Sequence, residues 1–290
     1  MHKFLRSIGF TDLKKKDMDL LLQQIAERPE VMKVTTDSEG NEFAELTCEY
    51  GPGYGIMVRG IYDEGDNFQP EYYFPYLEAT KVSTEEYIEI EKHADRESYA
   101  GVCDELHLGV TMVFYLQNVA DFLAEKRLFK SKNTRRGAKL AALSTEGKII
   151  LPIVERDRNK HADDAKRTEH NKLIAQAREG NEEAIESLTM EDMDTYSILS
   201  QRIHNEDVLS IVSSTFMPYG IESDQYSIIG DILNVKRTEN TLSNEIVYIL
   251  SVVCNDIQFD VCINENDLMG EPKIGRRFKG NIWLQGSTLS

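Results

Sequence analysis

The chain has 290 residues, of which 41% are hydrophobic and 29% charged, and its formal net charge is -17. This length is sufficient for two domains with hydrophobic cores, and the composition is ordinary for a globular protein. The strong negative charge disfavours non-specific binding to nucleic acids and to anionic membranes, because both carry negative charge themselves.

The N-terminal part predicts one helix followed by an antiparallel sheet. Apolar residues at helical spacing from Met18 to Ile25 predict a helix over residues 11–28. Thr11 or Asp12 can cap this helix, and Pro29 ends it. From residue 42 the apolar residues alternate, which is typical of half-buried strands. The predicted strands cover residues 42–50, 54–63, 71–77, 85–92, 98–103 and 110–117.

The next elements continue this part of the chain. Residues 110–116 are apolar on both faces, so we expect their strand in the middle of the sheet. Asn118 precedes a short predicted helix over residues 119–128. Residues 138–143 and 148–153 predict a hairpin around the turn 144–147, because Gly147 suits the left-handed conformation that such loops need.

The middle of the chain is densely charged. Residues 155–178 predict an exposed helix that bridges two domains. Asn181 can cap a helix over residues 182–188, and residues 191–203 predict another helix. Residues 208–216 are ambiguous, because their apolar residues fit a helix slightly better than a strand. We find no internal repeat and no low-complexity tract.

The C-terminal part predicts a small antiparallel sheet. If residues 255–256, Asn-Asp, form a two-residue turn, one face of the hairpin is apolar throughout, which fixes the register. Cys254 and Cys262 then point to opposite faces, which argues against a disulfide between them. Gly230 predicts a bulge or a sharp bend in the first strand. The opposed pairs are Cys254–Ile257, Val252–Phe259, Leu250–Val261 and Tyr248–Ile263.

Together these elements predict an α+β protein. We expect an N-terminal antiparallel-sheet domain over residues 1–154 and a helical bridge over 155–205. Residues 206–290 then form a small, antiparallel, β-barrel-like domain that resembles an OB-fold. Small barrels of this kind often serve as binding platforms, although architecture alone does not define a function.

The last strand carries the candidate ligand-binding residues. Arg276, Arg277 and Lys279 stand out in an acidic chain, and Trp283 lies on the same polar face as Lys279. A tryptophan beside bases can stack on a nucleobase or another planar ligand. The interpretation that we prefer is that Trp283 packs against neighbouring helices while the bases pair with acids.

No motif defines a reaction. Glu89, Glu91 and His93 share one face of a predicted strand and are metal candidates, but such a row is more typical of a solvated strand face. The glycines between residues 51 and 60 do not have the spacing of a phosphate-binding loop, and no catalytic serine, cysteine or zinc signature is present. We therefore predict no catalytic residue and no cofactor. A dispersed active site stays open, because such sites are defined by geometry.

Several features predict a cytoplasmic location. The first ten residues, MHKFLRSIGF, lack the sustained apolar core of a secretory signal. The most apolar runs, 110–116 and 246–254, are much shorter than a membrane span. The chain also contains four cysteines without C-x-x-C spacing, which is consistent with a reducing compartment. They are Cys48, Cys103, Cys254 and Cys262.

A set of stretches along the whole chain is similar to a known family. They are MHKFLRSIGF at 1–10, YYFPYL at 72–77, ESYAGVC at 97–103, EEAIESLTMEDMDTY at 182–196, FMPYGIESDQY at 216–226, FDVCIN at 259–264 and GRRFKGNIWLQG at 275–286. With these stretches the chain resembles the uncharacterised bacterial domain-of-unknown-function family 3881. The resemblance implies a cytosolic bacterial protein, and it transfers no catalytic residue.

The sequence leaves the function unknown and favours one class over two others. The absence of a catalytic signature and the two predicted sheets favour a non-enzymatic cytosolic binding or assembly protein, with a protein or small-molecule partner. The first alternative is single-stranded nucleic-acid binding through the C-terminal barrel, which the net charge disfavours. The second is an enzyme with a dispersed site.

Overall fold

The structure is a computed structural model that describes residues 1–92, 97–105, 108, 110–129, 133–152, 172–174, 176–177, 180–190 and 214–289. All structural statements below refer to these residues. The predicted bridge over 155–205 lies largely outside them, as do His93, the predicted helix over 191–203 and residues 208–213. Within the described part, a helix covers residues 182–190, and Ala184 N donates to Asn181 Oδ1 at 3.2 Å, which confirms the predicted cap.

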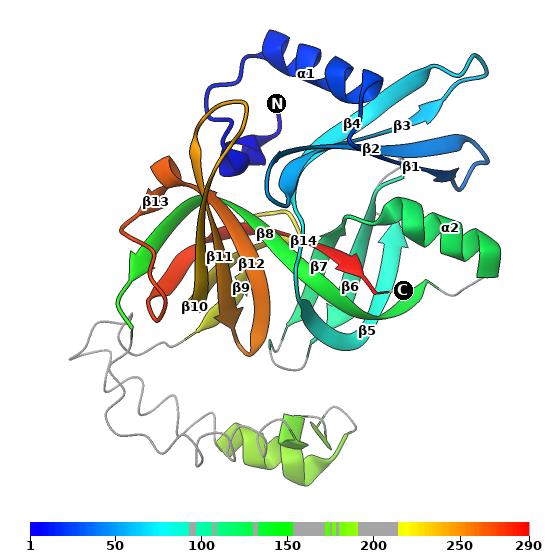
Figure 1. Cartoon of the computed structure of the whole chain (residues 1–290). Coiled ribbons are helices and arrows are strands. Elements are labelled where there is room, and N and C mark those ends of the chain that lie inside the picture. Colours follow the sequence, from blue (N-terminus) through cyan, green and yellow to red (C-terminus); the bar gives the residue numbers. More distant parts are fainter. Residues whose placement is uncertain are drawn as a thin grey trace.

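The first layer of the molecule is a four-stranded antiparallel sheet with the order β1-β2-β3-β4 (Figure 1). Helix α1 covers one face of this sheet, because Met18, Leu21 and Ile25 are buried in one hydrophobic core with Leu46 and Val58 of β2 and β3. The elements are η1 (Lys3–Ile8), α1 (Lys15–Glu27), β1 (Val31–Thr36), β2 (Glu42–Gly51), β3 (Tyr54–Tyr62) and β4 (Phe68–Leu77).

The second layer is a ten-stranded mixed sheet, which lies beneath the first in Figure 1. The described residues are therefore mostly strand, with few helices, which agrees with the α+β class in its broad sense. The elements are β5 (Val82–Lys92), β6 (Tyr99–Asp104), β7 (Thr111–Leu116), α2 (Val119–Phe129), β8 (Thr134–Ile150), β9 (Thr215–Pro218), β10 (Gln225–Glu239), β11 (Ile246–Cys254), β12 (Ile257–Asn264), η2 (Glu265–Asp267), β13 (Leu268–Met269) and β14 (Arg277–Thr288).

The pairings of this large sheet close into two rings that share β8 and β14. One ring runs β10-β11-β12-β8-β14 and back to β10, and the other runs β5-β6-β7-β14-β8 and back to β5. Strand β8 pairs with β5 at residues 134–139 and with β12 at 141–144. Likewise, β14 pairs with β10 at 277–283 and with β7 at 285–286. Each shared strand thus passes from one ring into the other.

The two rings have the same connectivity. Each contains three consecutive strands joined by antiparallel pairings, then a helical element, then one of the two shared strands. The sets are β5-β6-β7-α2-β8 and β10-β11-β12-η2-β14, and in the second the two-residue strand β13 lies between η2 and β14. Each ring also contains one parallel pair, β7–β14 or β12–β8. Strands β5–β8 of the predicted domain 1–154 therefore share one sheet with strands β9–β14 of the predicted domain 206–290. The fold repeats an arrangement that the sequence does not display as a repeat.

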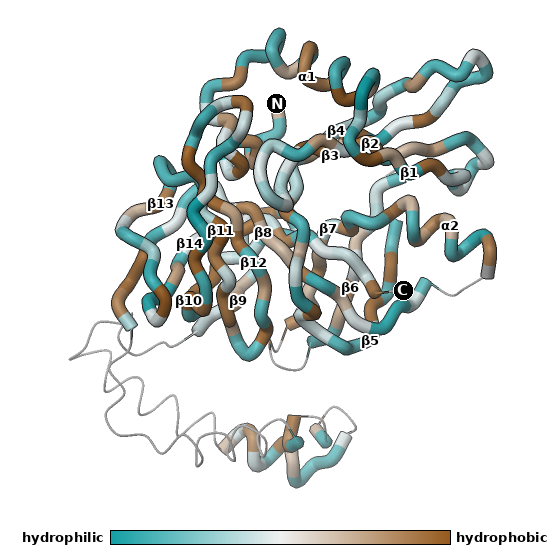
Figure 2. Tube along the Cα trace, viewed as in Figure 1, coloured by the Kyte–Doolittle hydropathy of each residue, from teal (hydrophilic) through white to brown (hydrophobic). Residues whose placement is uncertain are grey.

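A continuous hydrophobic core fills both rings. Phe114 of β7, Leu250 of β11 and Phe278 and Leu284 of β14 are each 0% exposed and belong to the same core. Figure 2 shows hydrophobic stretches along the strands that meet in the middle of the molecule. Burial of this apolar surface is the main stabilising contribution to such an arrangement.

A buried arginine joins the first sheet to the second. The guanidinium of Arg59 is 2.7 Å from the carboxylate of Glu45, and both side chains are buried. It also donates to the backbone oxygens of Leu116 and Gln117. Burial alone lowers the pKa of Arg59, but Glu45 and two tyrosines outweigh this and raise it above its ordinary value.

The hairpin β11–β12 confirms the register predicted from the sequence. All four predicted apolar pairs, including Cys254–Ile257, are opposed in the structure. Asn255 and Asp256 have φ values of 47° and 65°, which is the left-handed conformation that the two-residue turn requires. Cys254 and Cys262 lie in different hydrophobic cores, and both thiols are free.

The predicted hairpin at 138–153 is wrong, because β8 continues through the expected turn. Strand β14 pairs along nearly the whole of β8, and this long-range pairing overrides the local turn preference. Ser144 and Glu146 oppose Ile282 and Asn281, so Thr145 is the extra residue of a β-bulge. The hydroxyl of Ser144 donates within this bulge to the backbone oxygen of Asn281, at 2.8 Å.

Smaller differences concern the ends of elements. Helix α1 begins at Lys15 without a side-chain cap, so neither Thr11 nor Asp12 caps it. Residues 31–36 form β1, which the sequence pattern does not predict. Residues 215–216 of the ambiguous segment belong to β9. The register shift in the pairing of β10 with β11 falls just after Ile232, and not at Gly230, where the sequence predicts a bulge or bend. Glycine at position 230 instead leaves room for β11, because a Cβ there would lie 2.6 Å from Val252 Cγ1.

Candidate functional site

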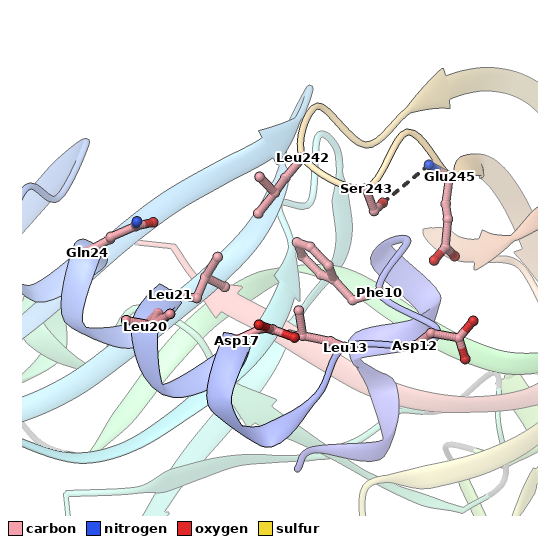
Figure 3. Close-up of a pocket in the computed structure, with 10 residues that line it drawn as sticks. All are labelled: Phe10, Asp12, Leu13, Asp17, Leu20, Leu21, Gln24, Leu242, Ser243 and Glu245. Atoms are coloured by element: carbon pink, nitrogen blue, oxygen red, sulfur yellow. Dashed lines mark hydrogen bonds between the residues drawn. The ribbon is translucent and has the colours of Figure 1, made fainter.

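An apolar concavity lies between α1 and the loop 240–245 that joins β10 to β11 (Figure 3). It encloses about 400 Å³ and is called the α1 groove below. One wall comes from α1, the other from the loop, and Phe10 lies between them in the view of Figure 3. The lining residues are Phe10, Asp12, Leu13, Asp17, Leu20, Leu21, Gln24, Leu242, Ser243 and Glu245.

Helical periodicity produces the first wall. Asp17, Leu20, Leu21 and Gln24 recur at i, i+3, i+4 and i+7, so they share one face of α1. Leu21 is 4% exposed and lies against the sheet, whereas Leu20 is 59% exposed. The groove therefore lies at the edge of the buried face of the helix, where an apolar side chain is accessible.

Asn240 fixes the second wall. Its amide nitrogen donates to Ile8 O at 2.7 Å, and its amide oxygen accepts from the backbone N–H groups of Leu242 and Ser243. Gly9 has a φ of 91°, and a Cβ on it would lie 2.8 Å from Asn240 Cβ, so this contact requires glycine. The loop is thereby held against η1, and the exposed Leu242 faces the groove.

The charged residues that line the groove are all acids. The carboxylate of Glu245 accepts from Thr11 N at 3.0 Å, from Thr11 Oγ1 at 2.6 Å and from Asn264 Nδ2. These three donors hold the carboxylate in one orientation. Asp12 and Asp17 add two more acidic side chains to the lining. The groove thus combines an apolar surface with an acidic rim.

The one hydroxyl among the lining residues has a structural role. Ser243 Oγ donates to Gly9 O, and it accepts from the backbone N–H of Glu245 at 3.2 Å, the contact drawn in Figure 3. Among the described residues that line the groove there is no histidine, cysteine, lysine or arginine. This arrangement suits binding by burial and charge, and it does not assemble a nucleophile with a base.

The structure buries Trp283, which is 5% exposed. Its ring stacks on Phe4 at 5.3 Å between centroids and lies 5.2 Å from the ring of Tyr115. The indole Nε1 donates to Asp224 Oδ2 at 2.7 Å. The tryptophan thus packs between η1, the first sheet and the rings, rather than on an open polar face.

The three bases of the last strand do not share one surface with the tryptophan. Arg277 is 3% exposed, and its Nε donates to Leu151 O at 2.9 Å. Burial lowers the pKa of Arg277, although Asp231 opposes this. Arg276 donates to Glu271 O, and Lys279 is exposed. Ligand binding by these four residues stays a prediction; Trp283 and Arg277 are buried, whereas Lys279 is exposed.

The metal candidates are only partly described. Glu89 and Glu91 are exposed on β5 and alternate with the buried residues Ile88 and Ile90, as the pattern of a solvated strand face predicts. His93 lies outside the described residues. Within the part of the chain that the structure describes, no group of three or more His, Cys, Asp or Glu side chains is arranged to hold a metal ion.

A second concavity of about 330 Å³ lies between the start of β5 and the β11–β12 turn. Its lining includes Glu85, Glu86, Glu105 and Asp256. Glu105 is 2% exposed and accepts a hydrogen bond from Thr84 Oγ1 at 2.5 Å. The apolar residues that line this acidic notch are Val82 and Ile257, fewer than the five that line the α1 groove.

Sequence reasoning missed the α1 groove. Its walls lie more than 200 residues apart in the chain, and no local motif marks either of them. The only available signal was Leu20, an apolar residue at the edge of the predicted helix face.

The fold defines an α+β protein in which a small antiparallel sheet covers a larger mixed sheet. The family described as "Domain of unknown function, E. rectale Gene description (DUF3881)" matches residues 5–286, and the chain belongs to it. No curated protein and no solved structure matches the chain. In the described ranges, no helix combines the length and the apolar character needed to cross a membrane.

Proposed function

We propose that this protein is a non-enzymatic binding protein, and that the α1 groove receives a segment of a protein partner. The observation that carries the proposal is an apolar groove with accessible leucines on both walls, Leu20 at 59% and Leu242 at 53% exposure. Grooves beside a helix commonly bind an extended or helical peptide segment through such side chains.

The rigidity of the groove supports this proposal. Asn240, Ser243 and Glu245 fix the loop wall through hydrogen bonds to η1 and to the segment before α1. Phe10, at the floor, is 4% exposed and meets Tyr50 edge-on at 5.1 Å between ring centroids. A preformed site needs little ordering upon binding, which favours affinity.

The finer fold assignment belongs to the same proposal. We interpret each ring as an OB-like barrel, because it has five strands, one parallel pair and a helical element before its fourth strand. In this interpretation β8 and β14 each serve as the fourth strand of one barrel and the fifth of the other. The cytosolic location and the absence of membrane and nucleic-acid partners are further parts of the proposal, supported by the net charge of -17 and four free cysteines.

One observation favours single-stranded nucleic-acid binding, and one opposes it. OB-like barrels often bind single strands, and the last strand carries three bases. The burial of Trp283 and Arg277 removes the stacking surface that this alternative needs. We expect the fluorescence of the single tryptophan to stay unchanged when oligonucleotides are added at low salt.

The proposed function is tested with a displayed library of random peptides about 12 residues long, selected on the full-length protein. Enriched peptides are expected to bind the wild type and to lose binding to the variant Leu20→Glu/Leu242→Glu. Ile221→Glu is the matched control, because Ile221 is fully exposed at 100% and lies outside the groove. Enrichment of peptides that ignore the leucine changes, or no enrichment at all, contradicts the proposal.

A further inference from the structure

We propose that the partner segment is a short amphipathic helix with an apolar stripe bordered by lysine or arginine. This inference rests on the proposed function and adds the chemistry of the partner. It follows from three properties of the α1 groove: the distribution of its apolar side chains, the sign of its charges and its length.

The apolar surface has the form that a helix stripe fits. Leu20 and Leu242 project from opposite walls, and Phe10, Leu13 and Leu21 lie between them. A helix that enters such a groove places residues i, i+3, i+4 and i+7 on its apolar floor. The apolar residues of the groove thus complement one face of a helix and leave the flanks of that helix at the rim.

The charges at the rim of the groove determine which charge the flanks of the bound helix should carry. Asp12, Asp17 and Glu245 are the charged lining residues, and Glu245 is held in place by Thr11 and Asn264. Lys14, Lys15 and Lys16 precede or begin α1 but do not line the groove. Arg6, also outside the lining, is paired with Asp267 and is attracted in addition by Glu245 and Asp12. An acidic partner would meet these carboxylates and a net charge of -17, whereas a basic one is attracted by both.

The length of the groove sets the length of the helix. The lining residues of α1 run from Asp17 to Gln24, and Asp12 and Leu13 precede the helix. Since a helix rises about 1.5 Å per residue, the helical part of this wall is about 10 Å long and matches about two turns of a bound helix. A partner segment of about 8 residues is therefore sufficient to span it.

Two synthetic peptides of about 14 residues test the inference by fluorescence anisotropy with the full-length protein. Both carry the same leucine stripe, and they differ only in having lysine or glutamate on the flanks. We expect the leucine–lysine peptide to bind, more weakly as salt is raised, and the leucine–glutamate peptide not to bind. Asp17→Asn and Glu245→Gln should each weaken binding of the lysine peptide about two- to five-fold.

Glu64→Gln is the matched control, because Glu64 is an exposed acid in the β3–β4 turn and its change removes the same charge. If Glu64→Gln weakens binding as much as Glu245→Gln does, the attraction is non-specific and the inference fails. If neutral or acidic library peptides bind in the groove while the lysine peptide does not, the inference fails and the proposed function stands. If no peptide binds in the groove, both fail.

Discussion

Replacement of Asn240 by alanine tests how the loop wall of the groove is held. The side chain is 0% exposed and makes three hydrogen bonds, one to Ile8 O and two from the N–H groups of Leu242 and Ser243. Asn240→Ala removes all three and keeps the Cβ that contacts Gly9. We expect a loss of stability together with a looser groove.

The magnitude follows from the groups that lose a partner. The buried oxygen of Ile8 is left without its donor, which costs about 1–3 kcal/mol. The N–H groups of Leu242 and Ser243 belong to residues that are at least partly exposed, so they can bond to water and each contributes about 0.5–1.5 kcal/mol. The free energy of unfolding should therefore fall by at least about 2 kcal/mol.

Urea denaturation followed by tryptophan fluorescence measures this change, because the single tryptophan is buried where η1, the first sheet and the rings meet. The control is Asn67→Ala, since the side chain of Asn67 is exposed and its amide donates to Asp63 within one turn. The control should change stability by less than about 0.5 kcal/mol. A loss below about 1 kcal/mol for Asn240→Ala would refute the reasoning.

Three further predictions concern the pH response, the buried ion pair and the shared sheet. Burial, together with Lys3 and the terminal amine, lowers the pKa of His2 from 6.5 to about 4, so the unfolded chain binds a proton first and stability falls as the pH drops through this window. The loss in the free energy of unfolding reaches about 3 kcal/mol near pH 4 and should be absent in His2→Gln. If urea denaturation gives the wild type and His2→Gln the same dependence of stability on pH, the prediction is contradicted. Arg59→Met should cost about 3–5 kcal/mol by leaving Glu45 buried without its partner, and the double variant with Glu45→Met should cost less in a double-mutant cycle. Fragments 1–152 and 214–290 should purify as a complex when co-expressed and remain unfolded by circular dichroism when separate; independent folding of either fragment would support the division into separate domains.

Local chemistry made part of the fold predictable. The register of β11–β12 follows from one turn and an apolar face, because a shift by one residue would reverse that face. The cap of the helix at 182–190 is equally local. In contrast, the bulge at Thr145 looks like a turn in the sequence, and only the distant strand β14 makes it part of a continuous strand.

The candidate site was not predictable for a related reason. Trp283 stands out in the sequence beside three bases, but its environment is set by Phe4, Tyr115 and Asp224, which are distant in the chain. The α1 groove depends likewise on the bond from Asn240 to Ile8, a contact across 232 positions. Periodicity and spacing describe one segment at a time and contain no information about such pairs.

The central claim is that a basic amphipathic helix binds between α1 and the loop 240–245. Hydrogen–deuterium exchange of the full-length protein, with and without the leucine–lysine peptide, tests it most directly. The account predicts slower exchange in segments 9–25 and 240–246 and unchanged exchange in the last strand, 277–288. Protection of the last strand without protection of the groove, or no protection at all, would contradict it.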